Sequence, residues 1–138
     1  MHAILYRSTA TGPVSPADIE QIADAAARRN ALWSITGLLL HGPDAHGRHG
    51  FAQWIEGDAE NTEYLFALIC ADCRHTDVTR IADGHDLVGY ALPTGGSGMR
   101  ATAVDCLPET VDAFFSHAAL CHDASDRARQ DPARPHGR

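Results

Sequence analysis

Lysine is absent from this chain of 138 residues, and all eleven of its basic residues are arginine. Eighteen acidic residues outnumber them, so the formal net charge is -7 at pH 7. Because a nucleic-acid partner requires a basic face that neutralises phosphates, this charge balance argues against such a partner. Long apolar runs are lacking too, and none approaches the ~20 residues that a membrane-spanning helix needs.

A secretion signal is also missing from the start of the chain. Residues 1–6 have neither the basic start nor the small-residue cleavage site of a signal peptide. We therefore expect a cytoplasmic protein without a membrane partner. The length corresponds to one domain, which buries roughly two-thirds of its unfolded surface and needs no disulfide or metal to fold.

Cysteine is sparse, and only Cys70 and Cys73 have the C-x-x-C spacing of a redox or zinc site. This pair falls at the end of a predicted helix, whereas a thioredoxin-like pair lies at the start of one. The other two, Cys106 and Cys121, form no second close pair for a tetrahedral zinc site. We expect the cysteines to be buried or half-buried free thiols.

Three histidines, His41, His46 and His49, surround a predicted loop over residues 42–50. A zinc site would need a fixed pair of ligands on a rigid element together with a carboxylate. A loop this rich in glycine supplies neither, so we predict a solvated loop and no metal site.

Hydrophobic periodicity and end signals predict the secondary structure of most of the chain. Strands are expected over 3–9, 35–41, 51–56, 78–82 and 87–92, the last resuming at 99–104. Helices are expected from Pro16 to about Arg29, after Asp58, and after Pro108. The order βαββαβ, with one more strand and a helix, indicates an α+β ferredoxin-like sandwich whose third helix covers the second face of the sheet.

The second predicted helix is expected to turn four apolar side chains toward the sheet: Tyr64, Leu65, Leu68 and Ile69. Ferredoxin-like folds also include acylphosphatases, which need an arginine in a phosphate-binding loop after the first strand. Residues 8–14 contain no arginine, which makes this small-hydrolase hypothesis a distant one.

Three polar residues stand out among the predicted elements. Tyr6 lies in the first strand, where a half-buried structural role is ordinary. Gln53 lies among apolar neighbours and is either solvent-facing or buried with partners, because an unsatisfied buried amide costs about 1–3 kcal/mol. Taken alone, the solvent-facing interpretation is favoured for Gln53, and a helix C-cap is favoured for Asn30. A Tyr and a Gln on strands of one sheet, with no nucleophile or metal set beside them, suggest a hydrogen-bond network around a bound ring.

Four segments then appear in order and with near-family spacing. They are Ile4-Leu5-Tyr6-Arg7-Ser8, Arg29-Asn30-x4-Ile35-Thr36-Gly37-Leu38-Leu39, Phe51-x-Gln53-x-Ile55-Glu56-Gly57 and Asp72-x-Arg74-His75-x-Asp77-Val78. Over roughly residues 2–100 the chain resembles the BLUF family, the blue-light sensors that bind FAD, and it is similar to a divergent member of the short single-domain type.

The resemblance implies a site and a mechanism. The flavin ring would lie between the two helices, Tyr6 would donate an electron and a proton, and Gln53 would bridge Tyr6 to the flavin and then rotate or tautomerise. An amide suits this role because it carries donors and an acceptor on one pivot. Met99 would be the third photoactive residue. Tyr6 and Gln53 would also contact the cofactor, together with Arg29, Asn30, Ile35, Phe51 and Ile69.

The resemblance also implies an organisation and partners. We expect a BLUF-like flavin-binding domain over 1–104, a helical extension over 105–122 and a disordered tail over 123–138. The protein would be a sensor rather than an enzyme, a homo-oligomer, and a signal source for an unidentified downstream protein. Leu68 stands where many members carry an arginine, and glycines interrupt 95–98. A flavin-free BLUF-like interaction module is therefore the alternative.

Overall fold

The computed structural model describes residues 1–84, 87 and 98–118. Its elements are β1 (His2–Ala10), α1 (Pro16–Leu32), β2 (Thr36–Pro43), β3 (His49–Gly57), α2 (Ala59–Ala71), β4 (His75–Asp83) and β5 (Gly98–Ala103). Residues 111–118 form a further helix. The predicted βαββαβ order is confirmed. Apart from residue 87, the strand expected over 87–92 lies outside the described residues.

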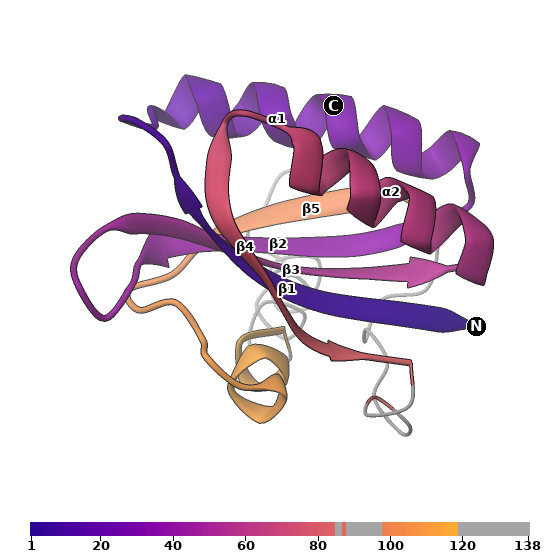
Figure 1. Ribbon diagram of the computed structural model, residues 1–138. Helices are drawn as coiled ribbons and strands as arrows, with labels where there is room; N and C mark the ends of the chain where they lie inside the picture. The colour runs from indigo at the N-terminus through magenta and orange to yellow at the C-terminus, as the bar shows by residue number, and fades with distance from the viewer. Residues whose placement is uncertain (85–86, 88–97, 119–138) are drawn as a thin grey trace, which may run out of the picture.

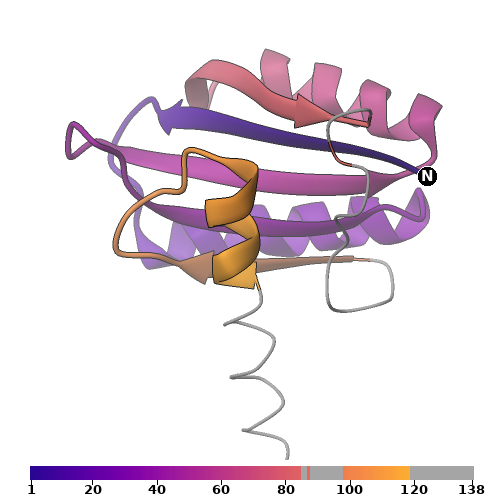
Figure 2. The same cartoon turned by 90° about the horizontal axis from the view of Figure 1, so that it is seen from below.

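The five strands form one mixed sheet in the order β4-β1-β3-β2-β5. β1 pairs antiparallel with β3 and β4, β2 pairs antiparallel with β3, and β5 pairs parallel with β2. α1 and α2 lie side by side on one face of the sheet (Figure 1), and the helix at 111–118 lies on the other face (Figure 2). This is the ferredoxin-like sandwich with a third helix that the sequence predicted.

Alternation along the strands divides the core between the two faces, because successive side chains point to opposite sides of a sheet. The face away from α1 and α2 carries a cluster that includes Leu5, Leu40 and Trp54, with Phe114 packed against it. The face toward α1 and α2 carries Ile4 and Tyr6 in one cluster, and Leu39 and Phe51 in another. Polar side chains on this second face are therefore enclosed between the sheet and two helices.

Both long helices begin at residues that the sequence identifies as caps. The Ser15 hydroxyl accepts a bond from the Asp18 backbone N–H at 3.1 Å, and the Ser15 N–H donates to the Asp18 carboxylate at 2.9 Å. Asp58 accepts in the same way from the backbone N–H of Asn61 at 3.2 Å. These bonds satisfy backbone donors that a helix start otherwise leaves open.

Two predicted boundaries are wrong. α1 continues to Leu32, so Asn30 is fully buried inside its last turn and is not a cap. The hairpin between β2 and β3 is tighter than the expected loop over 42–50, because the Asp44 carboxylate accepts from two backbone N–H groups of the turn, at 2.8 and 2.9 Å. His49 consequently lies in β3.

Two side-chain expectations are also wrong. Tyr64 is 59% exposed and Leu68 is 39% exposed, while Leu65 and Ile69 do pack onto the sheet as expected. Cys70, Cys73 and Cys106 are free, but they are exposed and not buried. Cys121 lies outside the described residues.

Within residues 1–84 and 98–118, no helix combines the length and apolar character required to cross a bilayer. Over the same part of the chain, no three His, Cys, Asp or Glu side chains gather closely enough to hold a metal ion.

Candidate flavin-binding site

Tyr6 and Gln53 are direct partners across the β1–β3 ladder, and both side chains turn toward α1 and α2. The Tyr6 hydroxyl donates a hydrogen bond to Gln53 Oε1. Tyr6 is 3% exposed and Gln53 is 4% exposed. The solvent-facing interpretation of Gln53 is therefore wrong, and the amide is buried with the phenol as its partner.

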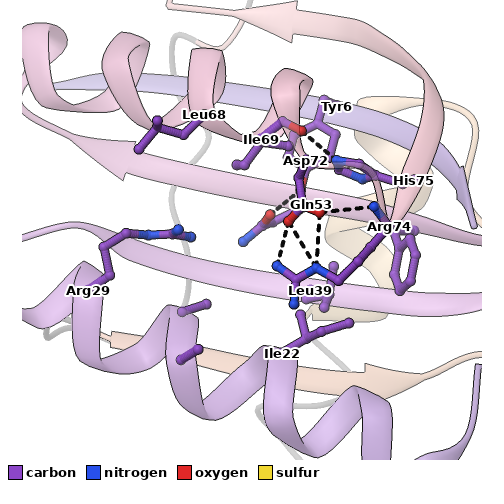
Figure 3. A pocket seen from close by; sticks show the side chains of 13 residues that line it. Tyr6, Ile22, Arg29, Leu39, Gln53, Leu68, Ile69, Asp72, Arg74 and His75 are labelled. Atoms are coloured by element: carbon purple, nitrogen blue, oxygen red, sulfur yellow. Dashed lines mark hydrogen bonds and ion pairs between the residues drawn. The ribbon is translucent and has the colours of Figure 1, made fainter.

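A cavity that is open to solvent at its mouth adjoins this pair between α1 and α2. Ile22, Ala26 and Arg29 line it from α1, and Leu68 and Ile69 line it from α2. Arg29 extends from α1 into the space between the two helices (Figure 3).

The floor and rim of the cavity come from the sheet and from the chain that follows α2. Leu39 and Phe51 form an apolar floor beside Gln53, while Asp72, Arg74 and His75 form a polar rim. A planar ligand would thus have apolar contacts on its faces and hydrogen-bonding groups at its edges, as small-molecule sites commonly provide.

Hydrogen bonds hold the three residues of the polar rim in place. Arg74 Nε donates to both Asp72 carboxylate oxygens, at 3.0 and 2.9 Å, and these bonds hold the pKa of Asp72 below its ordinary value. His75 Nδ1 lies 2.9 Å from Ser8 Oγ, and His75 Nε2 lies 2.5 Å from the Ile69 carbonyl. The His75 ring therefore ties the end of α2 to β1, the strand that carries Tyr6.

Burial dominates the electrostatics of the site. It raises the pKa of the Tyr6 phenol well above its ordinary value, and the nearby Arg29 cation opposes this rise. Burial likewise lowers the pKa of Arg29. Among the described residues, Arg29 Nε is a buried donor without a hydrogen-bond partner. Since such a donor is costly to leave unpaired, it fits a ligand that brings acceptor oxygens into the cavity.

Gly37 on β2 lets the Asn30 amide approach the sheet closely, next to the amide of Gln53. A Cβ on Gly37 would meet Asn30 Nδ2 at 3.3 Å and Gln53 Nε2 at 3.7 Å. The Gln53 amide, the Arg29 donor and the apolar floor together match a flavin ring, which has an apolar body and an edge of carbonyl and ring-nitrogen acceptors. The residues present therefore fit the cofactor.

The structure brings together most of the residues expected to contact a cofactor. Five of them line the cavity: Tyr6, Arg29, Phe51, Gln53 and Ile69. Asn30 does not line the cavity and is buried next to Gly37. Ile35 is fully buried in the core with Ile4 and Ile55 and supports the site without lining it. Met99 is the β5 backbone partner of Gly37.

Sequence reasoning assigned no role to Asp72, Arg74 and His75, although it quoted them as part of a pattern. The sequence carried a usable signal, because an aspartate, an arginine and a histidine lie close together just after a helix that packs on the sheet. Their bonds to one another, to Ser8 and to Ile69 depend on the bend at the end of α2, which the pattern does not reveal.

A family model described as "BLUF: Sensors of blue-light using FAD" matches residues 1–86. This chain belongs to the BLUF family. The cofactor of the family is FAD, as its description states, and the buried Tyr6–Gln53 hydrogen bond is the one the resemblance led us to expect.

Curated relatives share this BLUF segment. The chain is 44% identical over 78 residues to the photoactivated adenylate cyclase subunit beta of Euglena gracilis, which covers 56% of this chain and 8% of the relative. It is 32% identical over 78 residues to the blue light- and temperature-regulated antirepressor BluF of Escherichia coli strain K12, covering 56% and 18%. The chain thus spans less than a fifth of the length of these relatives.

Solved BLUF structures share the fold. The dark-state structure of the BLUF protein BlrB superposes with a TM-score of 0.60 at 31% identity, covering 74% of this chain and 71% of BlrB. BlrP1 of Klebsiella pneumoniae gives a TM-score of 0.65 at 27% identity, covering 86% of this chain and 28% of that protein.

Proposed function

We propose that this BLUF protein senses blue light through the Tyr6–Gln53 pair, with the ring of FAD seated in the cavity between α1 and α2. The single observation that carries the proposal is the buried hydrogen bond from the Tyr6 hydroxyl to Gln53 Oε1 at the wall of that cavity. Bound FAD supplies the absorption of blue light and the acceptor for an electron.

Tyr6 is suited to give up an electron and a proton together. Its raised pKa keeps the buried phenol protonated at physiological pH. A phenol that loses an electron becomes a strong acid, and Gln53 Oε1 already accepts its hydrogen bond. The proton therefore has a defined first acceptor and needs no rearrangement to reach it.

Gln53 is the group that changes state. Its amide carries two donors on one atom and acceptor capacity on the other, so rotation or tautomerisation exchanges what it presents to Tyr6 and to the cavity. Gly37 lies beside the amide, where a Cβ would make only an ordinary van der Waals contact with Nε2, at 3.7 Å. One reoriented side chain could thus rewire the site without a lasting chemical change.

Cofactor binding is assigned to the side chains around the cavity. The Arg29 guanidinium and the Asn30 amide would hold carbonyl groups at the ring edge, while Phe51 and Ile69 would pack against the ring. Three observations support this: the unpartnered Arg29 Nε, the position of the Asn30 amide next to Gly37, and the apolar floor of the cavity.

Two routes lead from Gln53 to the surface. Gly37, which adjoins the Gln53 amide, pairs with Met99 of β5. Trp54 follows Gln53 in β3 but points to the opposite face, where its ring lies 4.7 Å from that of Phe115. A change at Gln53 would thus reach both β5 and the helix at 111–118, with Met99 as the proposed photoactive residue on the first route.

The remaining assignments follow from this role. We infer that residues 1–104 act as the flavin-binding domain, that 105–122 extend it, and that 123–138 form a tail. The chain would act as a sensor without catalysis of its own, and its signal would pass to a separate protein in the cytoplasm, from a homo-oligomer. The relatives named for cyclase or antirepressor activity illustrate the kinds of output with which BLUF segments occur.

The colour of the purified protein tests the proposal. A flavin-loaded protein should absorb in the blue, shift its absorption to longer wavelength on blue illumination, and return in the dark. A colourless protein that does not take up added FAD would contradict the proposal and favour the flavin-free interaction module.

A further inference from the structure

Two exposed thiols flank the bend at the C-terminal end of α2, and the function proposed above uses neither. Cys70 lies in the last turn of the helix, and Cys73 follows the C-cap residue Asp72. Both are free and exposed to solvent. They are therefore accessible to small oxidants and close together in the sequence.

The backbone between the thiols passes from helical to extended. Ala71 is helical, and Asp72 is extended with φ -75° and ψ 123°. A helical residue followed by an extended one is the backbone pattern of a type VIII turn, in which the first and fourth Cα atoms lie within about 7 Å. Disulfides join Cα atoms roughly 4.4–6.8 Å apart, so a Cys70–Cys73 link requires the bend to be as tight as such a turn.

The same bend carries the polar rim of the cavity. Asp72 lies between the two thiols, and Arg74 and His75 follow directly. The Cys73 carbonyl accepts a bond from Thr11 Oγ1 at 2.9 Å, and the Arg74 carbonyl accepts one from the Thr11 N–H at 3.1 Å. A covalent link across the bend would therefore act on the rim with no intervening element.

We propose that Cys70 and Cys73 form a reversible intramolecular disulfide that adjusts the rim of the flavin cavity. The bond itself is independent of flavin, whereas its effect on light sensing rests on the proposed function. This pair lies at the C-terminal end of a helix, whereas catalytic dithiols of the thioredoxin type lie at the N-terminal end of one. The pair is thus assigned a regulatory role and not an oxidoreductase activity.

The oxidant is a small disulfide such as oxidised glutathione. One cysteine thiolate attacks it, which forms a mixed disulfide and releases one glutathione thiol. The second cysteine thiolate then attacks the protein sulfur of the mixed disulfide and releases the other glutathione thiol. Overall, two protein thiols lose two electrons and two protons, one S–S bond forms in the protein, and the oxidant disulfide is reduced to two thiols.

Mass spectrometry tests bond formation in the full chain. A C106S/C121S variant keeps only the two thiols of interest. After treatment with excess oxidised glutathione, we expect a monomer that has lost two hydrogens and resists alkylation at both cysteines, with both thiols restored by dithiothreitol. Peptide mapping of the oxidised chain without substitutions should give the same Cys70–Cys73 link. Persistent glutathione adducts, intermolecular dimers or two alkylatable thiols would overturn the proposal.

Two readouts test the effect on the rim, and one needs no flavin. In flavin-free protein, oxidation should slow amide hydrogen exchange over residues 72–75. In flavin-loaded protein, it should change the dark-recovery rate at least about twofold, which corresponds to ~0.4 kcal/mol. A C73S/C106S/C121S variant cannot close the link and should show neither change. A disulfide that leaves both readouts unchanged would refute the switch. If the protein fails to bind flavin, the mass and hydrogen-exchange tests still decide whether the disulfide forms and acts on the rim, because neither needs flavin.

Discussion

At the scale of single residues, the site depends on a buried polar pair whose members are hydrogen-bonded to each other. The Tyr6 hydroxyl donates to Gln53 Oε1 inside the layer between sheet and helices. Removing the Gln53 amide takes from the buried Tyr6 hydroxyl its acceptor, and a buried group left unsatisfied costs about 1–3 kcal/mol. Substitutions at the two positions should therefore affect light sensing and stability differently.

Replacing Tyr6 with phenylalanine removes the phenolic proton and keeps the ring contact with Phe66, whose centroid lies 5.7 Å away. We expect flavin to stay bound and the light-induced absorption shift to vanish, because no proton is left for Gln53 Oε1 to accept. Difference spectroscopy under blue light measures this. The control is Tyr64→Phe on the exposed side of α2, which should respond normally. A normal shift in Tyr6→Phe would assign the photochemistry to another donor.

Asn30→Ala removes a buried amide next to Gly37. If this amide holds the ring edge, FAD affinity should fall by about 1 kcal/mol or somewhat more, which is roughly a fivefold or larger rise in Kd. Equilibrium titration of flavin-free protein with FAD measures the change. Asn61→Ala on the exposed surface of α2 provides the matched control. Equal affinity in the two variants would leave Asn30 a purely structural role.

At the scale of elements, an ion network fastens α2 to the sheet edge. Arg80 of β4 donates to both Glu63 carboxylate oxygens, at 2.9 and 2.8 Å, and His2 Nε2 of β1 lies 2.9 Å from the same carboxylate. The Arg80 guanidinium also lies 4.6 Å above the ring of Phe66, which contacts Tyr6. The surface network thus borders the layer between the sheet and α2 that contains Tyr6.

Glu63→Gln should weaken this network in a pH-dependent way. Hydrogen bonds from Arg80 lower the pKa of Glu63 from 4.5 to about 2 in the folded protein. A lowered pKa stabilises the fold above the ordinary value, and this contribution disappears as pH falls from about 4.5 toward 2. Because Glu63 is partly exposed, we expect a loss of only about 0.5–1 kcal/mol near neutral pH.

Urea unfolding of wild type and Glu63→Gln at pH 7 and at pH 3 measures this difference. The difference in free energy of unfolding between the two proteins should be smaller at pH 3 than at pH 7. Glu20→Gln on α1 serves as control, since Glu20 makes no ion pair within the described part of the chain and should shift stability by no more than roughly 0.5 kcal/mol. A gap that stays constant with pH would mean that the Glu63 charge is not the stabilising feature.

At the scale of the whole molecule, consecutive residues of β3 face opposite layers. Gln53 faces the cavity under α1 and α2, and Trp54 faces the helix at 111–118. Since a strand alternates its side chains, any shift of the β3 backbone that accompanies the Gln53 change is felt on both faces. The central strand can therefore link the photoactive site to the opposite surface.

The sequence predicted the architecture well because its evidence is local. Alternating apolar residues define the strands, and Ser15 and Asp58 are caps whose chemistry is contained in the next few residues. Tertiary context decided what the sequence missed. Tyr64 belongs to an apolar stripe, but its ring stays exposed and lies beside that of Trp33, the C-cap residue of α1, with 5.7 Å between the ring centroids.

The residues themselves suggested a Tyr–Gln network around a bound ring, but the role of each site residue was predictable only through the resemblance. From the residues alone, Gln53 was assigned to solvent and Asn30 to a helix cap, and both side chains are buried. Burial of Gln53 depends on its register opposite Tyr6, and burial of Asn30 depends on an extra turn of α1. Neither follows from neighbours in the sequence, because both arise from how strands and helices meet.

The central claim is that Gln53 converts light into a changed hydrogen-bond network, and the blue-light difference spectrum of Gln53→Leu tests it most directly. Leucine keeps a similar volume and removes every hydrogen bond of the amide, so flavin should still bind. We predict a displaced dark spectrum and no light-induced shift, while Gln21→Leu on the exposed surface of α1 behaves as wild type. A flavin-loaded Gln53→Leu protein with the wild-type dark spectrum and light response would contradict the account.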